Sequence, residues 1–159
     1  MNKIKTEVEL NQIIAELRSK NKKIVWTNGC FDILHIGHVD LLEKAKSFGD
    51  ILIVGLNSDS SIKRLKGDLR PVIPQDERAK LLEAIQFIDY IIIFEDDTPC
   101  RLIKEFKPDI HVKGGDYSAT DYKRMPEAEI IHNYGGRVEI IPLIQSKSTS
   151  SIIQKINNS

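Results

Sequence analysis

Residues 24–49 read IVWTNGCFDILHIGHVDLLEKAKSFG and contain a strand, a loop and a helix in succession. From Ile24 to Thr27 the side chains are apolar at nearly every position, which predicts a strand buried on both faces. Apolar side chains then recur at helical spacing, at Leu41, Leu42, Ala45 and Phe48. Gly49 follows, and glycine commonly ends a helix in the left-handed conformation.

The same alternation of strand and helix continues along the chain. Four further apolar runs predict strands at residues 51–56, 90–94, 110–113 and 138–142. One helix is predicted at Leu10 to Leu17, where Thr6 and Glu9 have the spacing of a capping box, and another at Leu81 to Ile88. A third is predicted between Thr98, as N-cap, and Pro108, which would stop it, with Pro99 in its first turn. This order predicts an α/β, Rossmann-like fold: a parallel five-stranded sheet with helices on both faces.

The 159 residues are predicted to form a single domain. Residues 1–22 supply an N-terminal helix, residues 23–145 the α/β core, and residues 146–159 a C-terminal helix that starts with serine and threonine. Two long polar stretches, at residues 57–70 and 114–129, are predicted to be loops. Loops of this length in a compact domain are usually functional, and ligands of such sheets bind at the carboxyl ends of the strands.

The composition limits the classes of partner. Lys plus Arg and Asp plus Glu both number 23, so no net field attracts nucleic acid or an acidic membrane, and a phosphate ligand needs a local cluster of charge. No stretch approaches the roughly 20 apolar residues of a membrane span, and the start has no apolar run, so a cytoplasmic protein is expected. Cys30 and Cys100 lie far apart, which indicates a reducing compartment, and no dedicated metal ligands are predicted.

The loop after the first strand contains two histidines, His35 and His38, three residues apart. They can lie on one side of a first helical turn, where unpaired backbone N–H groups favour an anion. Gly29 and Gly37 would let the backbone approach a phosphate or a base. The spacing therefore predicts hydrogen-bond donors aimed at a phosphate, although an isolated pair of this kind is as often a surface or capping pair.

Three other stretches add candidate ligand contacts. Asn57-Ser58-Asp59 leads into the cations Lys63, Arg64, Lys66 and Arg70, which suit a triphosphate or an acceptor phosphate, with a solvated face as the alternative. Lys113-Gly114-Gly115-Asp116-Tyr117 closes the fourth strand, where a tight turn is the alternative. Residues 146–151, SKSTSS, gather hydroxyl groups at the start of a helix, and capping accounts for only one of them.

Gly29-Cys30-Phe31-Asp32, His35-Ile36-Gly37-His38 and Ser148-Thr149-Ser150 together resemble the cytidylyltransferase-like nucleotidyltransferases, which have G-x-F-D-x-x-H-x-G-H and a late S-T-[TS] helix start. Within that superfamily the middle of the chain resembles the adenylyltransferases that act on D-glycero-β-D-manno-heptose 1-phosphate. The segments that match are residues 57–59, 64–68, 70–72, 77–78, 97–99 and 112–117. The resemblance extends from Lys23 to Ile156.

This resemblance implies a substrate pair, a set of site residues and a setting. It implies transfer of an adenylyl group from ATP, as the Mg²⁺ complex, to a sugar 1-phosphate, with ADP-heptose and pyrophosphate as products, in a cytoplasmic homodimer of lipopolysaccharide-related carbohydrate metabolism. His35, His38 and Lys63 would be catalytic, and Asp32, Asn57, Asp59 and Arg64 would contact the sugar phosphate. The implied nucleotide contacts are Thr27, Asn28, Gly29, Cys30, Phe31, Gly37, Lys66, Arg70, Gly115, Asp116, Ser148, Thr149 and Ser150.

Some features depart from the pattern and leave alternatives open. Bifunctional members of the family also have an N-terminal sugar kinase, for which this sequence has no counterpart, and residues 144–147 read IQSK where glycerol-phosphate cytidylyltransferases have R-T-E-G. Residues 118–129 form a longer segment than expected, which leaves the acceptor open. The alternatives are a cytidylyltransferase acting on glycerol 3-phosphate or another sugar or polyol phosphate, and a non-catalytic nucleotide-binding regulatory module. His35-Ile36-Gly37-His38 is also similar to a motif of class I aminoacyl-tRNA synthetases. That class is disfavoured, because such an enzyme would need a tRNA-reading domain in addition to the single domain predicted here.

Overall fold

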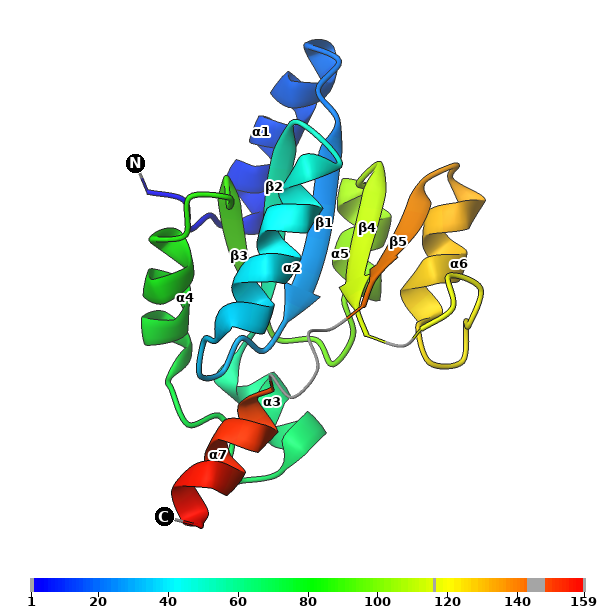
Figure 1. Ribbon diagram of the computed structural model, residues 1–159. Helices are drawn as coiled ribbons and strands as arrows, with labels where there is room; N and C mark the ends of the chain where they lie inside the picture. The colour runs from blue at the N-terminus through cyan, green and yellow to red at the C-terminus, as the bar shows by residue number, and fades with distance from the viewer. Residues whose placement is uncertain (1, 116, 143–147, 159) are drawn as a thin grey trace.

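Strand and helix alternate along the chain, as the sequence predicts (Figure 1). The computed structural model describes residues 2–115, 117–142 and 148–158. The strands are β1 (Ile24–Gly29), β2 (Ile51–Asn57), β3 (Tyr90–Phe94), β4 (Ile110–Gly114) and β5 (Arg137–Ile141). The helices are α1 (Glu7–Ser19), α2 (Ile36–Ser47), α3 (Asp59–Lys66), α4 (Gln75–Glu83), α5 (Cys100–Phe106), α6 (Pro126–Asn133) and α7 (Thr149–Asn157). All five predicted strands are confirmed, with ends that differ by at most two residues.

The five strands form one parallel sheet in the order β3-β2-β1-β4-β5. The chain builds outward from β1 through β2 to β3, and then returns to add β4 on the other side of β1. The strand order therefore reverses between β1 and β4. In open α/β sheets, ligands bind outside the carboxyl ends of the strands at such a switch point.

Each face of the sheet has its own apolar core. Val25 points into the core beneath α2 and α4, whereas its neighbours Ile24 and Trp26 point to the opposite face, which α1, α5 and α6 cover. All three are fully buried. Because strands of this sheet are covered on both faces, a near-continuous apolar run is the pattern they require. In Figure 1, α3 and α7 lie together beyond the carboxyl ends of the strands.

The polar stretch at residues 57–70 is not the loop that was predicted, because it contains helix α3. Ser58 caps this helix by accepting a hydrogen bond from the backbone N–H of Ser61 at 3.2 Å. Ile62 is fully buried and ties the helix to the core. One cap and one buried apolar residue thus suffice for a short helix in a sequence that shows little periodicity.

Three predictions about helix ends are wrong. Gly49 is not left-handed, because α2 ends at Ser47 with a right-handed C-cap at Phe48. A small residue is needed at Gly49 for a different reason, since a Cβ atom there would lie 2.7 Å from Cγ2 of Val25. Thr98 is not an N-cap, because Pro99 takes that position. Helix α4 ends at Glu83, so Ile88 packs into the core from the following turn.

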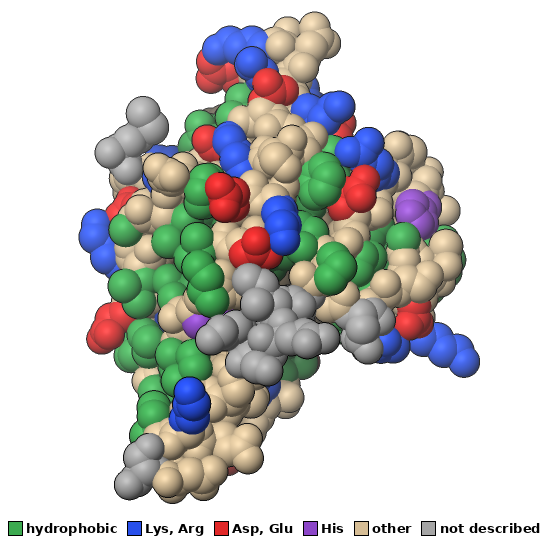
Figure 2. Space-filling view, viewed as in Figure 1, with side chains coloured by type: hydrophobic (Ala, Val, Ile, Leu, Met, Phe, Trp, Pro, Cys, Tyr) green, Lys and Arg blue, Asp and Glu red, His purple; other side chains and the backbone are tan. Residues whose placement is uncertain are grey.

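The N-terminal segment extends the sheet edge, which the sequence did not indicate. Ile4 bridges to Ile91 of β3 in parallel fashion, and the backbone N–H of Lys5 donates to the carbonyl of Ile91 at 2.8 Å. On the face drawn in Figure 2, acidic and basic side chains are interspersed, in keeping with a net charge of zero. Within the described ranges, no helix has the length and apolar character needed to cross a bilayer.

Candidate active site

A cavity of about 180 Å³ lies at the switch point between β1 and β4. The end of β1 and its loop provide one wall, α2 provides a second, and the end of β4 a third. The lining residues are Asn28, Gly29, Cys30, Phe31, His38, Leu41, Lys113 and Gly114. Four of the predicted nucleotide contacts and one predicted catalytic histidine therefore line one hollow.

The loop between β1 and α2 has an unusual backbone. Phe31 and Ile33 have φ angles of 46° and 55°, although neither is glycine. The left-handed region costs such residues on the order of 1–3 kcal/mol, so surrounding contacts must hold them there. Two sets of polar contacts do so, one centred on Asp32 and the other on Arg78.

The Asp32 carboxylate is buried and fixes the opposite loop. It accepts hydrogen bonds from the backbone N–H groups of Val72 and Ile73 at 3.0 Å each, and from Nε of Arg70 at 2.7 Å. Burial alone would raise the pKa of Asp32, but the two backbone donors and Arg70 outweigh it and lower the pKa. Asp32, predicted as a sugar contact, thus has its carboxylate engaged within the protein.

Arg78 of α4 is fully buried and joins three segments around the site. Nη1 donates to the carbonyls of Cys30 at 2.6 Å and Asn57 at 2.9 Å, so it links the ends of β1 and β2. Nε donates to the carbonyl of Ile73 at 2.9 Å, and Nη2 pairs with the Asp59 carboxylate at 2.7 Å. The sequence did not single out this residue as structural, because burial of an arginine leaves no periodic signal.

The two histidines form a stacked pair at the start of α2. Their ring centroids lie 3.9 Å apart with an interplanar angle of 30°. Nδ1 of His35 accepts a hydrogen bond from the backbone N–H of Gly37 at 3.1 Å, and Nδ1 of His38 accepts from the backbone N–H of His35 at 3.4 Å. Since both Nδ1 atoms are acceptors, the neutral rings have their protons on Nε2, where they can serve as donors.

Their surroundings keep these histidines neutral. Burial lowers the pKa of His35, and it lowers the pKa of His38 to about 4, assisted by the nearby charges of His35 and Lys66. Phe31 contributes to the burial, because its ring centroid lies 5.2 Å from that of His38. The charge of Lys66, in the last turn of α3, is close enough to His38 to contribute to this lowering of its pKa.

The four predicted cations differ in how far their charges are already paired. Arg64 pairs with Asp97 at 2.8 Å and also donates to the Glu95 carbonyl, and Arg70 pairs with Asp32. Lys63 and Lys66 are exposed in the last turn of α3 and have no ion pair or side-chain hydrogen bond within the described part of the chain. Cations also complement the dipole of a helix C-terminus, so their position alone does not identify a ligand.

The start of α7 lies beside the histidine loop. The Thr149 hydroxyl donates to the backbone carbonyl of Asp32 at 2.8 Å. Ser148 is the N-cap and forms a capping box with Ser151, so two of the hydroxyls serve the helix itself. Ser150 is exposed in the same first turn. The loop before α2, helix α3 and the start of α7, which lie far apart in the sequence, are thus brought to one end of the sheet (Figure 1).

The remaining predicted residues are placed as follows. Thr27 is buried in β1, and Oδ1 of Asn28 accepts from Nε1 of Trp26 at 3.2 Å. Asn57 is buried and donates to the Ser61 hydroxyl at 3.0 Å. Gly115 follows β4 with a φ of 139°, which suits only glycine. Asp116 and the segment Ser146-Lys147 lie outside the described residues.

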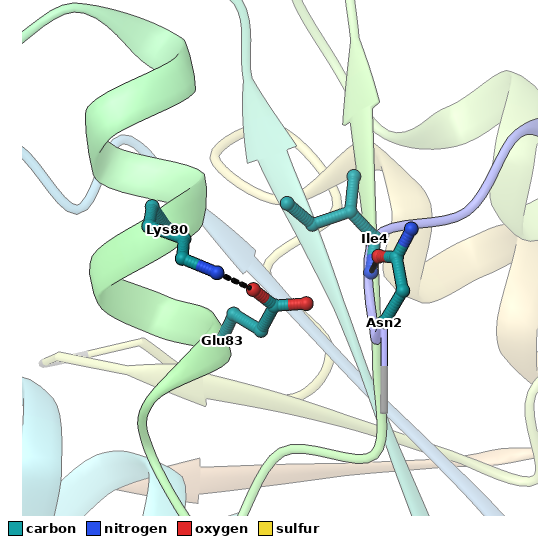
Figure 3. Close-up of a pocket in the computed structure, with 4 residues that line it drawn as sticks. All are labelled: Asn2, Ile4, Lys80 and Glu83. Carbon is teal, nitrogen blue, oxygen red and sulfur yellow. Dashed lines mark hydrogen bonds and ion pairs between the residues drawn. The ribbon is translucent and has the colours of Figure 1, made fainter.

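A larger hollow lies elsewhere and lacks the features of a site. It measures about 460 Å³ and is lined by Asn2, Ile4, Lys80 and Glu83, between the N-terminal segment and α4 (Figure 3). The charges of Lys80 and Glu83 are paired with each other at 2.6 Å. No three histidine, cysteine or acidic side chains of the described ranges cluster as metal ligands, either here or at the switch point.

Comparison with known proteins gives a consistent result. The family model described as cytidylyltransferase-like matches residues 26–155. The bifunctional protein HldE of Geobacter metallireducens is 51% identical over 154 residues, which are 97% of this chain and 31% of that protein. HldE of Nitratiruptor sp. is 50% identical over 98% of this chain and 32% of its own length. The chain thus spans about a third of the curated relatives it matches.

A solved structure is also similar. It is the lipopolysaccharide core biosynthesis protein from Thermoplasma volcanium, with a TM-score of 0.61 and 29% sequence identity. The match covers 77% of this chain and 97% of that one. The similarity therefore includes most of the sheet and its helices.

Replacing Arg78 by Met should lower the free energy of unfolding by about 3 kcal/mol or more, because one buried carbonyl, two partly buried carbonyls and one carboxylate lose their donor. Urea unfolding followed by circular dichroism measures this. Arg101→Met is the matched control: its ion pairs are half exposed, so a change below about 1 kcal/mol is expected. Equal effects of the two substitutions would contradict the role given to Arg78.

The low pKa of His38 predicts a pH dependence. Between about pH 4 and its ordinary value of 6.5, the unfolded chain binds a proton at this residue that the folded chain does not, so the free energy of unfolding rises with pH in that window. His35 and His111 have shifts of the same sign. The slope between pH 5 and 6.5 should be shallower in His38→Gln, and NMR should give a midpoint near pH 4 for the His38 ring. A midpoint near 6.5 would refute the assignment.

Proposed function

The chain belongs to the cytidylyltransferase-like family, and on that basis we propose that it transfers an adenylyl group from ATP to a sugar 1-phosphate. The acceptor we propose is D-glycero-β-D-manno-heptose 1-phosphate, with ADP-heptose and pyrophosphate as products. A phosphate oxygen of the sugar forms a bond to the α-phosphorus of ATP, and the bond from that phosphorus to the β-phosphate bridging oxygen breaks. The observation that supports this most directly is the stacked, neutral histidine pair at the switch-point cavity.

Catalysis of this reaction requires alignment of the substrates and stabilisation of charge more than it requires a general base. The attacking phosphate oxygen is already ionised at neutral pH, so no proton needs to be removed. His35 and His38 would direct their Nε2–H groups at the oxygens of the α-phosphate as negative charge shifts toward the leaving pyrophosphate. The dipole at the start of α2 favours an anion in the same place, even though the N–H groups of Gly37 and His38 are already bonded to His35.

Cations and hydroxyls near the histidines would hold the rest of the nucleotide. Lys63 and Lys66, whose charges are unpaired in the described part of the chain, would contact the triphosphate together with Ser148, Thr149 and Ser150. Nη2 of Arg70 is buried and has no hydrogen-bond partner among the described residues, which makes it a further donor for a phosphate. Magnesium would enter as the Mg–ATP complex, and we propose that the protein works as a homodimer.

Asp32, Asn57, Asp59 and Arg64 are proposed to shape the acceptor side of the site. Their side chains pair with Arg70, Ser61, Arg78 and Asp97 in this structure. A contact with the sugar phosphate through these side chains would have to displace or share those partners. We therefore propose that they act chiefly by holding the loops around the acceptor.

One matrix of assays tests the reaction. Purified protein and Mg²⁺ are incubated with ATP or CTP and with heptose 1-phosphate or glycerol 3-phosphate, and pyrophosphate release is measured. Pyrophosphate is expected only with ATP and the heptose phosphate together. Release with CTP and glycerol 3-phosphate would replace the proposal by a cytidylyltransferase, and nucleotide binding without any product would indicate a non-catalytic module.

His35→Ala or His38→Ala should lower kcat at least about a hundredfold, because loss of one preorganised donor costs ~3 kcal/mol of transition-state stabilisation. His132→Ala is the matched control: this histidine lies on α6, contacts Tyr122 and does not line the cavity, so kcat should stay within about twofold. Steady-state kinetics in the ATP and heptose phosphate assay measure both. Unchanged turnover in either of the first two variants would remove that histidine from the mechanism.

Thr149→Val should raise the KM for ATP about tenfold, because the single hydroxyl proton, which donates to the Asp32 carbonyl in this structure, would turn to donate to a phosphate of bound ATP, whereas Thr149→Ser should restore the KM. The variant also loses the bond to the Asp32 carbonyl, which should cost only about 1 kcal/mol of stability. Thr120→Val, in an exposed turn, serves as control. A lower melting temperature with an unchanged KM would mean that Thr149 only docks the helix.

A further inference from the structure

A buried carboxylate lies behind the candidate active site. Glu127, in the first turn of α6, is 2% exposed. Burial alone would raise the pKa of this carboxyl, but the neighbouring His111 and the charge of Lys113 outweigh it and lower the pKa below its ordinary value. Glu127 is therefore ionised at neutral pH, and a buried charge of this kind needs a partner.

His111 cannot supply the compensating charge. Its ring is fully buried, and burial lowers its pKa, so it is neutral at neutral pH. Nε2 lies 3.6 Å from Oε1 of Glu127, which is too long for a good hydrogen bond, and both ring nitrogens are without hydrogen-bond partners among the described residues. The positive charge must come from the other neighbour.

Lys113 provides that charge and also faces the cavity. Its Nζ lies 3.3 Å from Oε1 of Glu127 and 5.5 Å from the ring centroid of Tyr117. Lys113 also lines the switch-point cavity, opposite His38 and the loop after β1. An ammonium group has three N–H donors, and Glu127 accepts only one of them. The other two are available to the Tyr117 ring and to a ligand in the cavity.

We propose that Lys113 is a nucleotide-contacting residue of this cavity and that Glu127 is the positioning residue that holds its ammonium group in place. The inference rests on the proposed function, gives a specific role to Lys113 of the stretch that closes β4, and adds Glu127, which no motif contains. A free lysine has many rotamers, and fixing one of them costs free energy on binding. Because the buried carboxylate already orders the Lys113 ammonium group in the folded protein, this free-energy cost does not arise when the nucleotide binds.

Calorimetric titration with Mg–ATP tests the proposal without an acceptor. Glu127→Gln should raise the Kd for ATP about tenfold, which is near the upper cost of immobilising one flexible side chain. Glu129→Gln is the matched control, because this glutamate is exposed on the same helix, and its Kd should equal that of the wild type. An unchanged or lower Kd in Glu127→Gln would overturn the proposal, since removing a negative charge without a positioning role should favour an anionic ligand.

A second variant addresses Lys113 itself. Lys113→Met alone would leave Glu127 buried and uncompensated, which threatens folding, so the double variant Lys113→Met, Glu127→Gln is used. It should bind ATP no better than Glu127→Gln alone. Wild-type affinity in the double variant would show that Lys113 makes no contact, and would overturn the proposal.

Kinetics separate positioning from general damage. In Glu127→Gln the KM for ATP should rise with the Kd while kcat at saturating ATP stays within about twofold, and Glu127→Asp should recover part of the affinity. A fall in kcat with an unchanged Kd would count against positioning. If the wild type binds ATP but makes no ADP-heptose, the proposed reaction fails and the binding comparison still decides the role of Glu127. If it binds neither ATP nor CTP, both proposals fall.

Discussion

The site depends on one buried guanidinium group, that of Arg78. At the carboxyl ends of parallel strands, some backbone carbonyls need a donor from outside the sheet. Two of them, on Cys30 just after β1 and on Asn57 at the end of β2, accept hydrogen bonds from Arg78. A buried carbonyl without a donor costs on the order of 1–3 kcal/mol. Arg78 satisfies both, together with the carbonyl of Ile73, so three loops adopt fixed positions around a charge that is itself balanced by Asp59.

The left-handed conformation of Phe31 in the first loop follows from that arrangement. With Cys30 held by Arg78 and the Asp32 carboxylate held by the backbone of residues 72 and 73, the chain between them has little freedom. Phe31 turns onto His38 and excludes water from it, which lowers the pKa of that histidine. The same loop presents the Asp32 carbonyl to Thr149 of α7. The neutral state of the histidines and the placement of α7 therefore both depend on the conformation of the loop between β1 and α2.

Local patterns in the sequence predicted the strands and most helices, because burial on both faces of a parallel sheet selects apolar runs. They failed where a tertiary contact decides. Gly49 looks like a helix stop, yet it is required by the proximity of Val25. Helix α3 looks like a polar loop, because one buried isoleucine, Ile62, leaves no periodicity to detect. Motifs located the histidine loop and the start of α7, whereas the roles of Arg78 and Glu127 depend on burial, which sequence spacing does not report.

The predicted site residues divide by whether their hydrogen-bonding capacity is already used. The Asp32 carboxylate and the Arg64 guanidinium are paired within the protein, so a ligand that bound them would first have to break those contacts. The Nε2 donors of the histidines and the ammonium groups of Lys63 and Lys66 have no such partners in the described part of the chain. An anion gains most from donors whose pairing is incomplete, because binding then sacrifices only hydrogen bonds to water. Ligand binding therefore costs least at motif residues whose side chains keep a donor that the protein does not already use.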